Sequence, residues 1–302
     1  MSDVKNKMNI KMPVGMTIGP PTLRVKDIQK QLSFYENDLG LQVNRRYKTN
    51  DDLEAVDLGF KGKFTEYKEP LLILKHDPDA KQTTHNFAGL FHFAILVPDR
   101  KNLAYAYSAI TNSKTNFDGF ADHLVSESLY LHDPEHNGIE IYRDKSRNEW
   151  QYDTEGYVIM DTLPLDLESL LSELSKDDKK NTTFPNGSKI GHMHLRVTNL
   201  ERSVKFYQKL GLDITYDWSA VGASFLSAGG YHHHIGLNTW HSLGGKAHTK
   251  GEAGLDVSEI VVSDNSFIET LAKELEDHVQ KTNQNELLLS DPDGIMILIK
   301  SC

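Results

Sequence analysis

Hydrophobic and polar positions follow one order of elements that recurs along the chain. The stretches that begin at residues 20 and 192 both read Leu-Arg-Val, then a helix start, then Phe-Tyr and Leu-Gly-Leu. Alternating apolar residues at Leu23 and Val25 predict a strand, and the helical spacing that follows predicts a helix that ends at Gly40. Three further strands are predicted over residues 41–47, 53–60 and 71–75. The predicted unit is therefore β-α-β-β-β.

Two weaker copies of this unit are present. One has a predicted strand over residues 92–97, a helix over 102–110 and strands over 129–133 and 138–142; the other has a strand over 257–262, a helix over 266–276 and strands over 287–290 and 295–300. In both, Asp-Pro followed by Gly precedes the last strand, which is typical of a turn. Self-similarity of this kind predicts repeated structural modules.

The pattern predicts an α+β chain of four βαβββ modules. An N-terminal half over residues 13–143 holds the modules 13–80 and 88–143, and a C-terminal half over 188–302 holds the modules 188–241 and 253–302. Residues 144–187 are charged and are interpreted as a linker with a short helix over 165–174.

Charge and composition narrow the class of partner. The formal net charge is −10, whereas nucleic acids and anionic membranes need a positive surface. No apolar run is long enough to span a bilayer, and residues 1–12 lack the apolar core of a secretory signal. The sole cysteine is Cys302, so we expect no disulfide framework and a cytoplasmic location. Fourteen histidines suggest a metal held by histidines and carboxylates.

Several motifs resemble the vicinal oxygen chelate superfamily, which includes glyoxalases, bleomycin resistance proteins and extradiol dioxygenases. They are Gly-His-x-His-Leu-x-Val at 191–197, Phe-Tyr-x-x-Leu-Gly at 206–211 and Asp-Pro-x-x-Asn-Gly-Ile-Glu at 133–140. The stretch 229–240, Gly-Gly-Tyr-His-His-His-Ile-Gly-Leu-Asn-Thr-Trp, resembles bacterial catechol-2,3-dioxygenase-like proteins. The resemblance implies two paired half-barrel cups with a metal inside one of them, and a homodimer as a possible assembly.

Equivalent positions in the four modules single out three residues as candidate metal ligands. In the first strand of each module, the position three residues before the shared Leu or Ile is occupied by Pro20, His92, His192 and Val257 in turn. Glu140 lies on the last strand of the second module. In the superfamily, the first and last strands of two paired modules line the metal cup. His92, His192 and Glu140 would then form a two-histidine, one-carboxylate triad, which suits Fe(II); Mn(II), Ni(II) and Zn(II) are alternatives.

This ligand set predicts how the modules pair. Pairing of the second module with the third brings all three ligands into one cup, and the repeat favours it. Sequential pairing, which is usual in extradiol enzymes, would place His192 in a different cup from His92 and Glu140. Both arrangements are open at this point.

The resemblance also implies groups that act beside the metal. Its acid/base histidine falls at His233, with His234 as the alternative, on what we expect to be the last strand of the third module. Adjacent strand residues point to opposite faces, so one of the two would face the cup. Tyr130 matches the active-site tyrosine of the family, and His123 matches a second histidine with a two-residue shift. Asn238 and Trp240 are candidates for closing the substrate pocket.

These residues favour an extradiol dioxygenase that cleaves a small aromatic diol with O₂. A glyoxalase-type isomerase or lyase using Ni(II) or Zn(II) is the first alternative, although that chemistry commonly involves a second carboxylate at the metal. A non-catalytic small-molecule-binding protein, or one with a decayed site, remains open.

Overall fold

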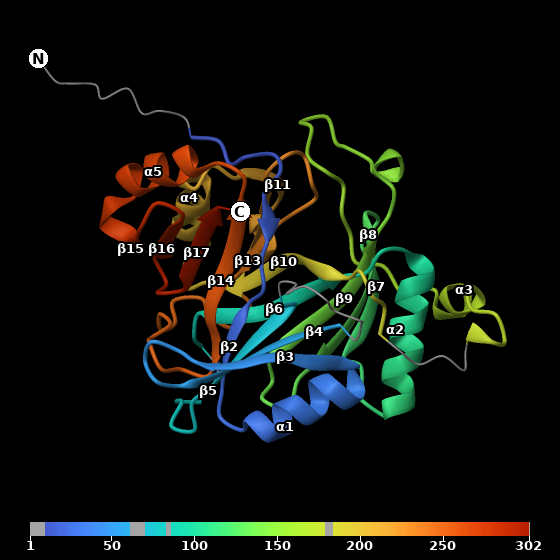
Figure 1. Cartoon of the computed structure of the whole chain (residues 1–302). Coiled ribbons are helices and arrows are strands. Elements are labelled where there is room, and N and C mark those ends of the chain that lie inside the picture. Colours follow the sequence, from blue (N-terminus) through green and yellow to red (C-terminus); the bar gives the residue numbers. More distant parts are fainter. Residues whose placement is uncertain (1–9, 61–69, 83–85, 179–183, 302) are drawn as a thin grey trace, which may run out of the picture.

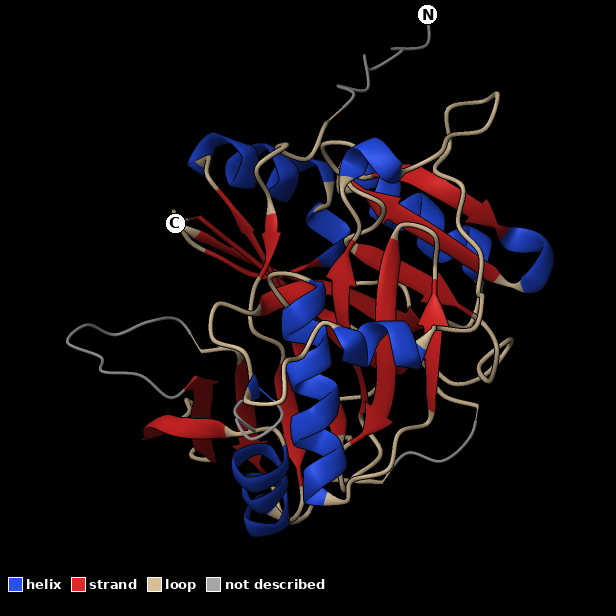
Figure 2. Ribbon diagram, turned by 90° about the vertical axis from the view of Figure 1, so that its right-hand side faces the viewer, coloured by secondary structure: helices blue, strands red, loops and turns tan. Residues whose placement is uncertain are grey.

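The computed structural model describes residues 10–60, 70–82, 86–178 and 184–301. Its elements fall into four modules, each with one strand, one helix and three further strands (Figures 1 and 2). The first module comprises β2 (Thr22–Val25), α1 (Ile28–Ser33) continued by a π-helical turn (Phe34–Asp38), β3 (Leu41–Lys48), β4 (Glu54–Phe60) and β5 (Leu72–His76). The second comprises β6 (Gly89–Leu96), α2 (Arg100–Ser113), β7 (Gly119–Asp122), β8 (Ser126–His132) and β9 (Gly138–Asp144).

The C-terminal modules repeat this order. The third comprises β10 (Lys189–Arg196), α4 (Leu200–Lys209), β11 (Asp213–Trp218), β12 (Ala223–Ser227) and β13 (Ile235–Asn238). The fourth comprises β14 (Gly254–Val262), α5 (Asn265–Glu274), β15 (Val279–Thr282), β16 (Glu286–Ser290) and β17 (Met296–Ser301). The short β1 (Thr17–Ile18) pairs with β14, and 3-10 turns lie at Arg147–Glu149, Ser219–Val221 and Glu276–His278.

The modules pair two by two into large curled sheets. One sheet runs β11-β12-β13-β10-β6-β9-β8-β7, so the third module joins the second, and the other runs β15-β16-β17-β14-β2-β5-β4-β3, so the fourth joins the first. Each seam is an antiparallel pair, β6 with β10 and β2 with β14. The α+β fold of two paired cups is thus confirmed. The favoured pairing of the second module with the third is also confirmed, and sequential pairing is wrong.

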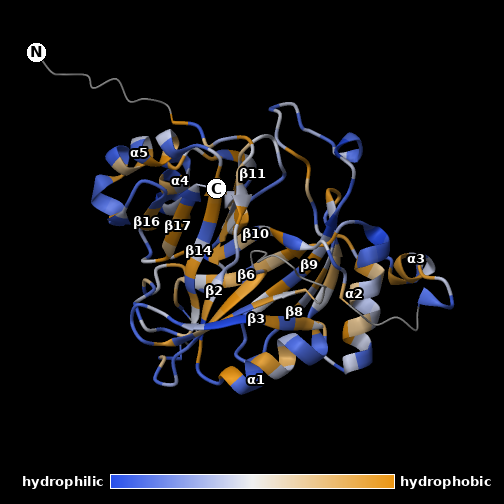
Figure 3. Ribbon diagram, in the orientation of Figure 1, coloured by the Kyte–Doolittle hydropathy of each residue, from blue (hydrophilic) through white to orange (hydrophobic). Residues whose placement is uncertain are grey.

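Each module helix begins at a side chain suited to cap it. The N-cap residues are Asp27, Asp99, Asn199 and Asp264, and each side chain accepts a hydrogen bond from a backbone N–H of the first turn. Such caps satisfy amide groups that have no partner within the helix. Apolar residues concentrate in strands such as β6 and β17, while the helices also carry polar residues (Figure 3). Within the described residues, no helix is long and apolar enough to cross a membrane.

The Asp-Pro turns tie successive modules together. In the second module, Asp133 accepts backbone hydrogen bonds within its own turn and a hydrogen bond of 3.0 Å from the Tyr35 hydroxyl of the first module. In the fourth module, Asp291 has the same place, and Tyr207 of the third module donates to it over 3.4 Å. The repeated Phe-Tyr and Asp-Pro motifs are therefore two halves of one contact.

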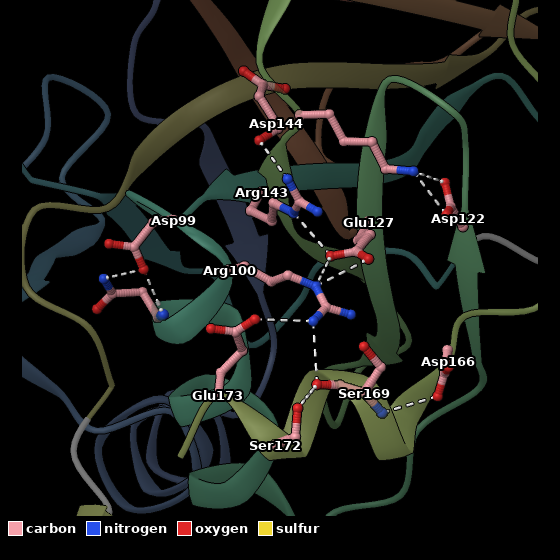
Figure 4. Close-up of polar contacts among 12 residues, drawn as sticks. Asp99, Arg100, Asp122, Glu127, Arg143, Asp144, Asp166, Ser169, Ser172 and Glu173 are labelled. Carbon is pink, nitrogen blue, oxygen red and sulfur yellow. Dashed lines mark hydrogen bonds and ion pairs between the residues drawn. The ribbon is translucent and has the colours of Figure 1, made fainter. Parts of the chain in front are cut away.

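The segment after β9 is attached to the second module by an ion-pair network around the buried Glu127, shown in Figure 4. Arg100 donates to Glu127 over 2.9 Å, and Arg143 donates to the same carboxylate over 2.8 Å. The Arg100 guanidinium also reaches the Ser169 carbonyl and the Glu173 carboxylate of the region around α3 (Leu167–Ser172). The predicted short helix is present, and its position is fixed by α2.

The two tyrosine–aspartate contacts give a stability prediction. Tyr35→Phe removes a hydrogen bond to a buried carboxylate and should lower the free energy of unfolding by about 1–2 kcal/mol. Tyr207→Phe removes the longer bond and should cost less. Urea unfolding of both variants tests this, and an equal or larger loss in Tyr207→Phe would contradict it.

Candidate metal centre

Three neighbouring strands place the predicted ligands together. Ala94 on β6 is in register with Glu140 on β9 and, across the module seam, with His192 on β10. Residues in register point to the same face of a sheet, and His92 shares that face because it stands two residues from Ala94. The small alanine side chain lies between two larger polar ones. The cluster thus follows from strand pairing rather than from a loop.

The ligand atoms of these residues converge in a buried position. His92 Nε2 lies 2.9 Å from Glu140 Oε2, and His192 Nε2 lies 3.0 Å from the same oxygen. One ligand atom from each of the three residues lies within 4.8 Å of the others. The three side chains are 8%, 4% and 1% exposed for His92, Glu140 and His192. Ser128 donates a hydrogen bond of 2.6 Å to the other oxygen, Oε1, and so orients the carboxylate.

The charges in the cluster suit a cation. Burial alone would raise the pKa of Glu140, but the neighbouring His192 and His92 imidazoles hold that pKa well below its usual range. Burial lowers the pKa of His192 to about 4, against the attraction of Glu140. At neutral pH the cluster then offers one carboxylate and neutral imidazole nitrogen.

The hydrogen bonds of the cluster leave nitrogen atoms unused. His92 Nε2 is near Glu140 Oε2 but has no hydrogen-bond partner among the described residues, nor has His192 Nδ1. A buried nitrogen without a partner is costly. Two imidazoles and a carboxylate form the donor set of non-haem Fe(II) sites and also accept Mn(II), Ni(II) and Zn(II). His92, Glu140 and His192 therefore fit such a metal.

A cavity of about 310 Å³ opens directly onto the cluster. His92 and Glu140 form part of its wall, and most of the remaining wall is apolar or aromatic, made by Phe91, Val125, Tyr130, Met160, Tyr216, Trp218, Phe225 and Trp240. Among the described residues that line it, none is lysine or arginine. The cavity is thus suited to a small, largely apolar molecule.

The predicted strand over His232–His234 is wrong. β13 begins at Ile235, and the three histidines precede it, after Gly229 and Gly230 with φ of 64° and 66°. Positive φ is readily adopted by glycine, so the pair allows the chain to turn. His233 reaches the cavity, with its ring centroid 4.1 Å from that of His192. The His234 ring bonds Ser227 over 2.7 Å and is not part of the cavity wall.

Of the other predicted groups, Tyr130, His123 and Trp240 line the cavity and Asn238 does not. Tyr130 is in register with Glu140, lines the cavity and lies 2.7 Å from His123 Nε2, so these two are brought together. Trp240 also lines the cavity. Asn238 is buried behind the wall, where its Nδ2 donates to His194 Nε2 over 3.0 Å.

The cavity wall also contains residues that the sequence did not single out, among them His194 and residues 160–162. His194 is buried, lines the cavity and lies in register with His92, with ring centroids 4.9 Å apart. The sequence could have indicated this position, because His194 stands two residues from His192 on one strand and so shares its face. Residues 160–162 of the expected linker form another part of the wall. No periodic pattern marks that segment, so its place depends on the tertiary structure.

Comparisons with known proteins agree with this architecture. The model of the Glyoxalase/Bleomycin resistance protein/Dioxygenase superfamily matches residues 17–151 and 189–299. A protein of Bacillus subtilis (strain 168) named catechol-2,3-dioxygenase is 37% identical over 280 residues, which cover 91% of this chain and 93% of that protein. The paired cups define a vicinal oxygen chelate architecture, and the chain belongs to the Glyoxalase/Bleomycin resistance protein/Dioxygenase superfamily.

Solved structures share the fold at low sequence identity. A structure from Bacillus subtilis subsp. subtilis strain 168 has a TM-score of 0.65 and 12% identity, over 97% of this chain and 86% of that one. Glyoxalase I from Zea mays has a TM-score of 0.55 and 17% identity, over 95% and 92% of the two chains. At these identities the likeness concerns the fold alone.

The cluster predicts how metal affinity responds to substitution. Glu140→Ala removes the sole carboxylate of the cluster and should abolish stoichiometric binding of Fe(II) or Zn(II). Ser128→Ala leaves all three ligands but frees the carboxylate, and should weaken binding by about 10- to 100-fold. Asp118→Ala, which removes a carboxylate beside His132 away from the cavity, is the control. Metal titration with elemental analysis measures all three, and full binding by Glu140→Ala would place the metal elsewhere.

Proposed function

We propose that the chain is a non-haem Fe(II)-dependent extradiol dioxygenase that cleaves a catechol-type ring with O₂. The observation that carries this proposal is the His92–Glu140–His192 cluster at the wall of an aromatic-lined cavity. The name of the 37% identical relative, catechol-2,3-dioxygenase, supports the same reaction. Both oxygen atoms of O₂ would enter the ring-opened product.

The proposed cofactor would be held by His92, His192 and Glu140. A triad of this type leaves coordination positions free for substrate and O₂, and bound Fe(II) supplies the redox chemistry. The protein supplies the position of the ring, the exclusion of water and the movement of protons. These tasks fall to the side chains that surround the cluster.

We infer that Tyr130 holds a substrate oxygen. The Asp161 carbonyl lies 2.8 Å from His123 Nδ1, so Nδ1 donates to it, and His123 Nε2 lies 2.7 Å from the Tyr130 hydroxyl, which donates to Nε2. Burial, together with the Glu140 charge, raises the pKa of Tyr130 well above its usual value. Tyr130 is therefore a neutral hydroxyl with a fixed orientation, and its oxygen is available to a substrate hydroxyl.

We infer that His233 moves a proton. Its side chain lines the cavity beside His192, and burial lowers its pKa well below the usual value. A neutral imidazole accepts a proton from a catechol hydroxyl and returns it to the ring-opened product. Of the two histidines proposed from the sequence, His233 takes this role because His234 lies outside the cavity wall.

The lyase alternative has less support. Among the described residues, the cluster contains one carboxylate, Glu140, and the further ionisable group beside His192 is His233. A second carboxylate would be expected for glyoxalase-type chemistry. The homodimer and the cytoplasmic location stay predictions.

Oxygen uptake tests the proposed reaction. After anaerobic loading with Fe(II), the protein should consume one O₂ for each catechol and form a yellow ring-opened product. Glu140→Ala should lose this activity, and Asp118→Ala should retain it. Tight metal binding without O₂ uptake in the presence of any catechol would contradict the dioxygenase proposal and favour the lyase. If no metal binds, a non-catalytic binding protein would be the remaining interpretation.

The cavity wall predicts a preference among catechols. An unpaired carboxylate buried against aromatic side chains costs several kcal/mol, and no lysine or arginine lines the described wall. We expect catechol and alkyl catechols to have kcat/KM values at least about 10-fold above that of 3,4-dihydroxybenzoate. Steady-state kinetics on this series tests it, and preference for the acid would show that a cationic side chain reaches the substrate.

A further inference from the structure

A chain of hydrogen bonds leads from the cavity to a partly exposed carboxylate. His233 Nδ1 lies 2.8 Å from His232 Nδ1, and His232 Nε2 lies 2.8 Å from Asp144 Oδ1. Asp144 is 26% exposed at its side chain, whereas His232 is fully buried. We refer to these residues as the Asp144–His232–His233 chain.

The three residues come from the two modules that meet at the β6–β10 seam. Asp144 ends β9, the strand that also carries Glu140, and the two histidines precede β13 of the third module. The His232 ring contacts Tyr231 and Trp150, at centroid distances of 4.1 Å and 5.4 Å. These two aromatic contacts and the hydrogen bond to Asp144 orient the imidazole.

Hydrogen-bond chemistry then assigns each proton. An ionised carboxylate accepts, so His232 Nε2 carries a proton toward Asp144. With the His232 proton on Nε2, the Nδ1 atom is the acceptor, and a contact of 2.8 Å between two ring nitrogens needs one proton between them. That proton belongs to His233 Nδ1. The His233 Nε2 atom then keeps its lone pair, on a side chain that lines the cavity.

We propose that Asp144, acting through His232, is a positioning residue that fixes His233 in the tautomer with its proton on Nδ1 and its Nε2 lone pair toward the cavity. The inferred tautomer rests on the hydrogen bonds of the Asp144–His232–His233 chain and not on the proposed function. What the lone pair does, namely accept the proton of a bound catechol, rests on the proposed function. The arrangement follows the logic of an orienting carboxylate behind a catalytic imidazole, with one more histidine between them.

The tautomer is measured directly by ¹⁵N NMR of histidine-labelled protein at pH 8, in the metal-free and Zn(II)-loaded forms. The His233 signals are assigned as those missing from His233→Asn. In the wild type we expect a protonated Nδ1 and an unprotonated Nε2 on His233. The variant Asp144→Ala removes the carboxylate, and His232→Phe removes the intervening imidazole but keeps a buried ring. In both variants the His233 proton should be shared between Nδ1 and Nε2, so that the Nε2 signal shifts toward the protonated form.

Kinetics with Fe(II) and catechol give the second readout. Asp144→Ala should lower kcat by about 10-fold or more with KM changed by less than about 2-fold, because the proton acceptor is affected and the binding wall is not. Asp118→Ala, which removes a carboxylate beside His132 away from the cavity, should change neither the His233 signals nor kcat.

The outcomes separate this inference from the proposed function. A wild-type His233 with its proton on Nε2, or an unchanged His233 signal in both Asp144→Ala and His232→Phe, overturns the inference even if the protein cleaves catechols. An Asp144-dependent tautomer in a protein without ring-cleavage activity supports the inference and contradicts the proposed function.

Discussion

The antiparallel pairing of β6 with β10 is the constraint on which the candidate site depends. It sets Ala94 between Glu140 and His192, and it joins two modules that are separated by more than forty residues of chain. Because side chains alternate between the faces of a strand, a slip of one residue at this seam would turn His192 away from the cup. The equivalent seam of β2 with β14 has the same pairing but carries no histidine at the matching positions, Pro20 and Val257.

Electrostatics explains why the cluster is organised around one carboxylate. A buried carboxylate without partners is expensive, and Glu140 is 4% exposed at its side chain. His92 and His192 approach one of its oxygens, and Ser128 bonds the other. A second carboxylate on the same strand, Asp144, is likewise paired with an imidazole, that of His232. β9 therefore carries both Glu140 of the cluster and Asp144 of the hydrogen-bonded chain.

Most of the fold followed from the sequence because the repeat carries long-range information. A histidine at one phase in two modules indicated that those modules meet, and the structure joins them at β6 and β10. The run His232–His234 could not be resolved in this way, because two glycines turn the chain before β13 begins. Residues 160–162 also carry no pattern, and their place in the cavity wall depends on contacts of their segment with the second and third modules. The predicted module boundaries and site roles stay predictions.

The central claim is that a metal binds at the β6–β10 seam, between His92, Glu140 and His192. The most direct measurement is anomalous X-ray diffraction at the iron absorption edge, on crystals loaded with Fe(II) under anaerobic conditions. The account predicts one strong anomalous peak within coordination distance of all three side chains. A peak at another place, or none at saturating Fe(II), would contradict it.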